Sequence, residues 1–276
     1  MKNVLENYFN IKNKVFFITG GAGLLGKEIC EVVLEFGGIP IIFDVSQTKS
    51  LKLSEALKEK YPNSKILFLK GDVSKKNDVK KAVNNIIKKY KKIDVLINNA
   101  EIDSKVKKNV KKHFSTFENY SIKDLNNEIN VGLNGAVICT QVIGSIMKKN
   151  KKGIIINISS DLGIIAPDQR IYNNNMNNYT QAKPVSYSII KHGIIGLTKY
   201  TASYWAKDGI RCNALCPGSI FNNHPKNFKN KLSKLIPMNR MANLNEYKSA
   251  IIFLSSDASS YMNGSSLIID GGRSIW

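Results

Sequence analysis

The sequence predicts a single α/β domain built on a parallel sheet that helices cover on both faces. Short apolar segments rich in β-branched residues alternate with longer segments of helical periodicity, and no repeat of fixed period interrupts them. The length of 276 residues suits one large domain of this class. Hydrophobic residues make up 43% of the chain and charged residues 22%, which excludes a disordered chain and a disulfide miniprotein.

The expected strands are short, apolar and bounded by glycine, asparagine or charged residues. They cover residues 14–19, 39–43, 66–70, 93–98, 153–159, 210–216 and 266–269. Most of the segments between them are long enough to hold a helix. Such connections join parallel strands, and the strands of a sheet buried on both faces are continuously apolar.

The expected helices carry apolar residues at helical spacing. They cover residues 25–36, 50–60, 78–90, 125–149 and 187–207. Together these elements predict one doubly wound domain of the Rossmann type over residues 1–276, with a seven-stranded parallel sheet.

The net charge of +20 comes mainly from lysine, because 41 basic residues face 21 acidic ones and only four of the basic residues are arginine. Lysine, asparagine and isoleucine are all abundant, as A+T-rich codons would produce. Proteins that bind nucleic acid rely on arginine and aromatic side chains, so no nucleic-acid partner is expected. An anionic substrate or an acidic partner remains open.

The four cysteines predict reduced, structural thiols. Cys30, Cys139, Cys212 and Cys216 form no CxxC pair and have no histidine cluster beside them, so we expect no metal site. The first residues lack the apolar core of a signal peptide, and no apolar run has the length of a membrane span. We therefore expect a cytoplasmic protein without a membrane partner.

A glycine-rich turn follows the first expected strand and opens the first expected helix. Its sequence, TGGAGLLG, places Gly20, Gly23 and Gly26 where backbone N–H groups can approach a pyrophosphate at a helix N-terminus. Asp44 ends the second strand, 18 positions after Gly26, where a carboxylate accepts from ribose hydroxyls and repels a 2′-phosphate. The alternatives are a turn without a ligand and an Asp44 that only caps a helix.

From this turn onward the chain resembles the short-chain dehydrogenase/reductase family. The motifs that carry the resemblance occur in order: Asp72-Val73, Asn98-Asn99-Ala100, Ser160 in an SxxG pattern, Tyr187-x-x-x-Lys191, Pro217-Gly218 and Asp270-Gly271-Gly272. Residues 165–172, 183–200, 237–242 and 270–276 resemble a subgroup associated with flagellin modification and nonulosonic-acid sugar biosynthesis.

The resemblance implies a catalytic set of Ser160, Tyr187 and Lys191, with Ser159 in place of Ser160 if the register is shifted by one. It implies NAD as the cofactor rather than NADP, because of Asp44. The cofactor-binding residues that it implies are Gly20, Gly23, Leu24, Leu25, Gly26, Asp44, Asp72, Val73, Asn99, Ala100, Tyr187, Lys191, Pro217, Gly218 and Ile220.

The residues themselves allow this chemistry. Tyrosine has an ordinary pKa near 10, and a positive charge one helical turn away favours the phenolate. Tyr187 can then exchange a proton with the substrate while hydride moves to or from the nicotinamide. Ser160 is expected to hydrogen-bond the substrate oxygen, and the resemblance implies that Lys191 also holds the nicotinamide ribose.

Four positions depart from the family pattern. Leu24 stands where a glycine is common, and Glu101 replaces the glycine of NNAG, either near the nicotinamide and substrate or as an exposed loop residue. Gly132 stands where many relatives have a helix asparagine, so the proton relay is expected to use backbone and water. After Pro217-Gly218 the usual threonine is missing, which leaves the Ile220 backbone and Asn222 as candidates.

Two segments are expected to select the substrate, an insert at 166–184 and a lid at 219–236. Glu101, Arg170 and Asn222 are candidate substrate residues. The leading function is an NAD-dependent oxidoreductase acting on a secondary alcohol or ketone of a sugar derivative. The alternatives are a 3-oxoacyl thioester reductase and a non-catalytic NAD-binding scaffold. The resemblance also implies a homo-oligomer, and we expect a homotetramer formed through the two long helices and the C-terminal tail.

Overall fold

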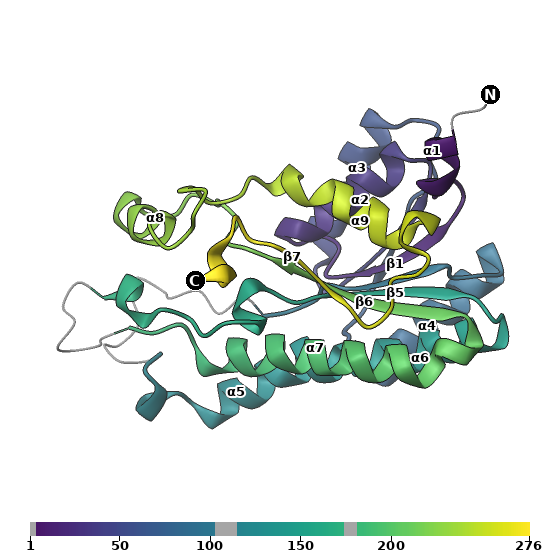
Figure 1. Cartoon of the computed structure of the whole chain (residues 1–276). Coiled ribbons are helices and arrows are strands. Elements are labelled where there is room, and N and C mark those ends of the chain that lie inside the picture. Colours follow the sequence, from purple (N-terminus) through teal and green to yellow (C-terminus); the bar gives the residue numbers. More distant parts are fainter. Residues whose placement is uncertain (1–3, 103–114, 174–180) are drawn as a thin grey trace.

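All seven expected strands form one parallel sheet, in the order β3-β2-β1-β4-β5-β6-β7 (Figure 1). The computed structural model describes residues 4–102, 115–173 and 181–276. The strands are β1 (Val15–Thr19), β2 (Ile39–Asp44), β3 (Leu67–Lys70), β4 (Val95–Asn98), β5 (Gly153–Ile158), β6 (Ile210–Pro217) and β7 (Ser266–Ile269). Each agrees with its expected segment to within two residues at either end.

The helices of the described residues include every one that the sequence predicts. They are α1 (Val4–Tyr8), α2 (Leu24–Glu35), α3 (Gln47–Lys60), α4 (Lys76–Tyr90), α5 (Ile122–Ile129), α6 (Gly135–Lys149), α7 (Val185–Trp205), α8 (Lys226–Ser233) and α9 (Lys248–Ser255). The short helices α1, α8 and α9 are additions that the sequence analysis did not assign.

Helices cover both faces of the sheet and bury its central strands completely (Figure 1). One hydrophobic cluster joins a face of the sheet to α2, α3 and α9, and another joins the opposite face to α4, α6 and α7. Every residue of β1, β4 and β5 is buried, which explains their uninterrupted apolar sequences.

The predicted helix 125–149 is longer and less regular than expected. It begins as α5, passes through a π-helical turn at Asn130–Asn134 and continues as α6. Over Ile122–Lys149 its length and hydropathy would allow it to cross a membrane, but α6 packs on β4 and β5 in the core of the domain. It therefore does not indicate a membrane protein.

The strand order places a topological switch point beside the centre of the sheet, where folds of this class have a crevice. The chain runs from β1 outward to β2 and β3, and then returns to β4 on the other side of β1. The connections on the two sides therefore diverge at the carboxyl ends of β1 and β4, which is where doubly wound sheets bind their ligands.

Candidate active site

The glycine turn lies at the carboxyl end of β1 and is shaped by close backbone contacts. Gly20 has φ +61°, and a Cβ there would lie 2.8 Å from the Ala100 Cα. A Cβ on Gly26 would lie 2.3 Å from the Gly20 carbonyl oxygen. These two glycines therefore allow α2 and β4 to approach the turn as closely as they do.

The N-terminus of α2 is open for an anion. The residue before the helix is Gly23, which has no side chain that could cap it. The first backbone amides of α2, which include those of Leu24 and Leu25, therefore have no side-chain cap. Such a terminus supplies N–H donors and a positive dipole end, and both suit a pyrophosphate.

Thr19 and Asn99 fasten this turn to the end of β4. The Thr19 hydroxyl accepts from the backbone N–H groups of Asn99 and Ala100 at 2.9 and 3.0 Å. The Asn99 side-chain amide donates to the carbonyl oxygens of Thr19 and Gly20, both at 3.0 Å. Asn99 thus holds the shape of the turn through its side chain, and Thr19 is a supporting residue that the sequence analysis missed.

Asp44 ends β2 with its carboxylate against the glycine turn. One oxygen accepts from the Ala22 N–H at 3.1 Å and the other from the Ser46 N–H at 2.9 Å. The cap of α3 is Ser46, whose hydroxyl accepts from the Lys49 N–H. Asp44 is therefore not the cap of this helix. Beside it Val45 is 62% exposed.

The remaining cofactor candidates follow the other strands. After β3 the Asp72 carboxylate accepts from the N–H and hydroxyl of Ser74, and Val73 is buried. After β6 a Cβ on Gly218 would lie 2.6 Å from the Asp270 Cα, so Pro217-Gly218 runs directly against the end of β7. Ile220 forms a bridge with Ala242.

Tyr187 and Lys191 lie one turn apart on α7. The Lys191 ammonium is 5.4 Å from the centre of the Tyr187 ring, and the Lys183 ammonium is 3.7 Å from it. Lys191 is only 4% exposed and donates to the Ile158 carbonyl oxygen at 3.1 Å. A buried ammonium beside the tyrosine is the arrangement that the sequence predicts.

Glu101 forms an ion pair with Lys191. The sequence left open whether Glu101 lies near the nicotinamide and substrate or is an exposed loop residue. Its side chain is 26% exposed and its carboxylate binds the ammonium next to Tyr187. Glu101 therefore lies beside the Tyr187–Lys191 pair, in contact with Lys191.

Ser159 and Ser160 point to different partners. The Ser159 hydroxyl donates to the Lys191 backbone carbonyl at 2.8 Å and so fastens the end of β5 to α7. The Ser160 hydroxyl donates to the Asp161 carboxylate at 2.7 Å and accepts from the Leu162 N–H at 3.1 Å. Ser159 is thus committed to a structural contact, which favours Ser160 as the residue that meets substrate.

A buried ion pair lies behind Ser160. The Arg273 guanidinium binds the Asp161 carboxylate at 3.1 Å, and both side chains are more than nine-tenths buried. Burial raises the pKa of Asp161, and the positive charge of Arg273 works against that rise. The sequence analysis matched the Asp270-Gly271-Gly272 motif but missed Arg273 directly after it.

Gly132 lies in the π-helical turn against α7. A Cβ at this position would lie 2.9 Å from the Ile190 Cγ2 atom. A side chain at this position, including that of an asparagine, would therefore displace Ile190. The absence of the asparagine therefore has a steric reason.

The two expected substrate segments meet each other. From the insert, Ile171 shares a small hydrophobic cluster with Leu232 and Ile236 of the lid, which contains α8. The rings of Tyr172 and Phe228 are 5.5 Å apart, and the Lys231 ammonium donates to the Asn173 carbonyl oxygen at 2.6 Å. Residues 174–180 of the insert lie outside the described residues.

The substrate candidates on these segments already have polar contacts. The Arg170 guanidinium makes several hydrogen bonds to the Asp168 carboxylate, at 2.6–3.1 Å, and its side chain is 60% exposed. The Asn222 N–H donates to the His224 Nδ1 atom at 3.2 Å. The structure thus places both residues on the insert and the lid, each in contact with a neighbouring side chain.

The described cysteines and acidic residues do not assemble into a metal centre: no group of three potential ligands comes together among the residues that the structure describes. All four cysteines are buried with free thiols, and burial raises the pKa of Cys212 to about 12. These thiols are structural.

Comparisons with known proteins agree with this geometry. A family model described as enoyl-(acyl carrier protein) reductase matches residues 22–274. An NAD-dependent glycerol dehydrogenase of Listeria innocua is 32% identical over 272 residues, which cover 97% of this chain and 96% of the relative. Post-translational flagellin modification protein A of Campylobacter coli is 28% identical over 262 residues, which cover 95% of this chain and 98% of the relative.

Among solved structures, a short-chain dehydrogenase of Leptospira borgpetersenii with bound NAD+ is 30% identical. It covers 99% of this chain and 96% of its own, with a TM-score of 0.82. The chain therefore belongs to the short-chain dehydrogenase/reductase family and is an oxidoreductase that interconverts alcohols and carbonyl compounds with a nicotinamide cofactor.

Proposed function

We propose that this protein is an NAD-dependent oxidoreductase that transfers hydride between the nicotinamide and a secondary alcohol or ketone of a sugar or sugar derivative. The observation that carries the proposal is the buried Lys191 ammonium beside Tyr187, at the crevice that the glycine turn and the end of β5 border. This arrangement combines an open anion site with a proton-transferring group.

The residues at the crevice fit a dinucleotide. The uncapped amides at the start of α2 suit its pyrophosphate, and Asp44 suits its adenosine ribose. Asp72 and Val73 would border the adenine. Ala100, Pro217, Gly218 and Ile220 would border the nicotinamide half, which supplies or accepts hydride when bound. Asp44 favours NAD over NADP, because its charge repels a 2′-phosphate.

In alcohol oxidation the Ser160 hydroxyl holds the substrate oxygen and Tyr187 takes the hydroxyl proton. The ammonium groups of Lys191 and Lys183 face the tyrosine ring and stabilise negative charge on its oxygen. In ketone reduction Tyr187 returns the proton to the carbonyl oxygen. With Gly132 in the helix, the proton reaches solvent through backbone groups and water.

The substrate segments favour a polar substrate. The insert at 166–184 and the lid at 219–236 carry Arg170 and Asn222, and both have polar groups that suit hydroxyls or an acid group. The glycerol dehydrogenase among the relatives supports a substrate with several hydroxyl groups, as a sugar derivative has. A 3-oxoacyl thioester is the second candidate, because the matching family model is described by an acyl-carrier reaction.

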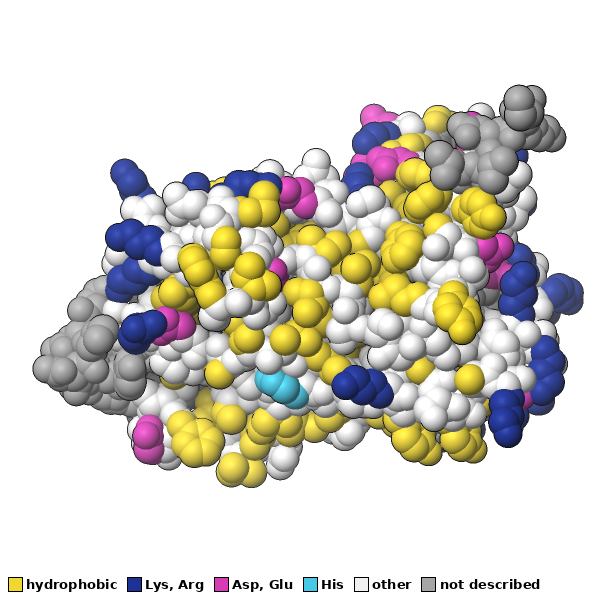
Figure 2. Space-filling model, viewed as in Figure 1, with side chains coloured by type: hydrophobic (Ala, Val, Ile, Leu, Met, Phe, Trp, Pro, Cys, Tyr) yellow, Lys and Arg dark blue, Asp and Glu magenta, His cyan; other side chains and the backbone are white. Residues whose placement is uncertain are grey.

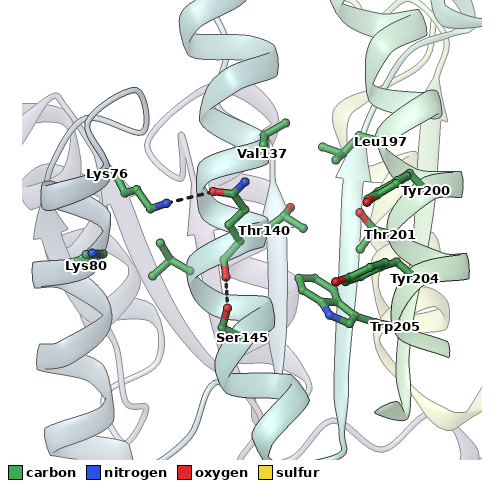
Figure 3. Close-up of a pocket in the computed structure, with 12 residues that line it drawn as sticks. Lys76, Lys80, Val137, Thr140, Ser145, Leu197, Tyr200, Thr201, Tyr204 and Trp205 are labelled. Carbon is green, nitrogen blue, oxygen red and sulfur yellow. Dashed lines mark hydrogen bonds between the residues drawn. The ribbon is translucent and has the colours of Figure 1, made fainter. Parts of the chain in front are cut away.

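We also propose that the enzyme is a cytoplasmic homo-oligomer. A hollow of about 660 Å³ lies between α4, α6 and α7, lined by side chains that include Val137, Leu197, Tyr200, Tyr204 and Trp205 (Figure 3). We propose that α7 of a second copy packs against this hollow. At the other side, the C-terminal strand β7 pairs with β6 at the edge of the sheet, and Ile275 and Trp276 beyond it are exposed.

The first experiment follows nicotinamide absorbance with NAD or NADH against free sugars, sugar phosphates, nucleotide sugars, glycerol and 3-oxoacyl thioesters. We expect turnover of a sugar-type compound, and we expect Tyr187→Phe to reduce kcat by about 100-fold or more. The Kd for NADH should change far less than kcat, because the phenol oxygen is at most one of many cofactor contacts.

Each outcome points to one function. Turnover of thioesters alone replaces the sugar proposal with the acyl one. Tight binding of NADH without turnover of any compound favours a scaffold that binds the cofactor without chemistry. Turnover that survives in Tyr187→Phe contradicts the proposed mechanism, whatever the substrate.

A further inference from the structure

Glu101 is an acidic residue of the site that the proposed proton transfer does not use. It follows Asn99 and Ala100, whose backbone N–H groups donate to the Thr19 hydroxyl beside the glycine turn. The family pattern has a glycine at this position, and a glycine brings no charge. Glu101 therefore adds one negative charge to this part of the site.

The Glu101 carboxylate is held in place by the Lys191 ammonium. The Lys191 side chain is 6% exposed and the Glu101 side chain is 26% exposed, so water screens this pair less than it screens a pair on the surface. A lysine ammonium has three protons to donate, and one of those of Lys191 goes to the Ile158 carbonyl at 3.1 Å. The ion pair has no net charge, so Glu101 opposes the field that Lys191 exerts on a ligand.

The other charged groups near Tyr187 add positive charge or form a neutral pair. The Lys183 ammonium is 3.7 Å from the centre of the Tyr187 ring. Behind Ser160, the Asp161 carboxylate binds the Arg273 guanidinium at 3.1 Å, so this pair adds no net charge. Two ammonium groups thus face the tyrosine ring, and the Glu101 carboxylate opposes them.

The two forms of a nicotinamide cofactor differ in the charge of the reacting ring. The oxidised ring carries one positive charge and the reduced ring is neutral, while the rest of the molecule is the same. Ammonium groups beside Tyr187 repel the oxidised ring, and a carboxylate there attracts it. We propose that Glu101 is a specificity-determining residue for the redox state of the cofactor: its carboxylate raises the affinity for the oxidised form relative to the reduced form, which favours the complex that oxidises an alcohol.

The inference rests on the proposed function for the place of the nicotinamide beside Tyr187, and cofactor binding tests it without a substrate. The Kd values of NAD+ and NADH are measured by calorimetric titration of the wild-type protein and of Glu101→Gln. We expect the variant to lose about threefold to tenfold more affinity for NAD+ than for NADH. This is the size expected for two unit charges several ångströms apart at a partly exposed site.

Two further variants separate the charge of Glu101 from its shape. Glu101→Gly removes both the charge and the side chain, and Glu101→Asp keeps the charge on a shorter side chain. We expect Glu101→Gly to change the ratio of the two Kd values by the same factor as Glu101→Gln, and Glu101→Asp to keep most of the wild-type ratio. If the glutamine variant fails to fold, the comparison of the glycine and aspartate variants makes the same test.

Asp44→Asn is the matched control, because it removes a carboxylate from the other end of the proposed cofactor site. Asp44 lies at the end of β2, where its carboxylate accepts from the Ala22 N–H, and we propose that it meets the adenosine ribose. The adenosine half has the same charge in NAD+ and NADH. Asp44→Asn should therefore weaken the binding of both forms by the same factor and leave the ratio of their Kd values unchanged.

Two results overturn the inference. One is a Glu101→Gln protein in which the affinities for NAD+ and NADH change by the same factor, and the other is a Glu101→Asp protein whose ratio matches that of Glu101→Gly. Failure of the proposed function shows separately, as turnover that Tyr187→Phe does not reduce or as a preference for NADP. In the second case the ratio is measured with NADP+ and NADPH, because the 2′-phosphate leaves the charge of the nicotinamide ring unchanged.

Discussion

Asp44 is the acidic residue at the end of β2, where we propose that the adenosine ribose binds. If its carboxylate selects NAD, Asp44→Ala should weaken NAD binding about tenfold or more and improve NADP binding, because a ribose acceptor is lost and a repulsive charge is removed. The measurement is the ratio of kcat/KM for the two cofactors.

Ser46→Ala is the control for Asp44. It removes the α3 cap without touching the carboxylate and should cost about 1 kcal/mol of stability without changing cofactor preference. If Asp44→Ala lowers stability by the same amount and leaves the cofactor ratio unchanged, the carboxylate has only a local structural role.

Glu101 compensates the buried charge of Lys191. Glu101→Gln leaves a neutral acceptor, and Glu101→Ala leaves the ammonium with the Ile158 carbonyl as its other contact in the structure. Because Glu101 is partly exposed, we expect the free energy of unfolding to fall by less than for a fully buried pair. The expected loss is about 1–2 kcal/mol for Glu101→Ala and less for Glu101→Gln. Urea unfolding measures it; equal stability of all three proteins would mean that the pair does not form in solution.

The elements of this fold were predictable wherever a local pattern marks them. The strands are continuous apolar runs, and the sequence places them to within two residues because both faces of the sheet are covered. The helix α8 was missed because its sequence, KNFKNKLS, is short and mostly polar. The apolar segment of α9 is as short as a strand, so its sequence does not distinguish a helix from a strand. Its packing on a face of the sheet decides that it is a helix.

The site was predictable where its residues form a motif on adjacent positions. Tyr187 and Lys191 lie on one helix, and the glycine turn is a continuous segment. The partner of Asp161 is Arg273, which is 112 positions away, and Glu101 reaches Lys191 on α7 from the loop after β4. Such pairs depend on strand order and side-chain direction, and a single sequence does not specify them.

The π-helical turn at Asn130–Asn134 brings Gly132 against Ile190 of α7, so a side chain at position 132 should affect the packing of these two helices. Gly132→Ala places a Cβ 2.9 Å from the Ile190 Cγ2 atom, and this atom cannot move without rotating a β-branched side chain. We expect a loss of about 1–3 kcal/mol in the free energy of unfolding.

Gly196→Ala is the matched control for Gly132. Gly196 lies inside α7 with nothing within 4 Å of a Cβ, so alanine should stabilise the helix by up to about 1 kcal/mol. In an Ile190→Ala background, Gly132→Ala should cost less. An unchanged cost there would show that the backbone of the π-helical turn, and not Ile190, requires glycine.

At the scale of the whole molecule, charge is distributed unevenly over the surface. Figure 2 shows Lys and Arg side chains over the α8 end and at the opposite edge, while the stretch along α7 and β7 between them is mostly uncharged. On or near this stretch, Ile189, Ile268 and Tyr204 are among the large side chains left exposed. An uncharged band between two basic ends favours contact between copies along the band.

The hollow beside α7 makes this association testable. Tyr200 and Tyr204 are 67% and 61% exposed and stack at 5.7 Å beside the hollow of Figure 3, so a second copy would bury both rings. We expect light scattering to give a homotetramer, and Tyr204→Glu to give a smaller species, because it places a charge in the buried contact. Leu51→Glu on α3, which covers the other face of the sheet, should leave the mass unchanged. A wild-type monomer at micromolar concentration would contradict the proposal, and an unchanged mass in Tyr204→Glu would move the interface from α7 to β7 and the C-terminal tail.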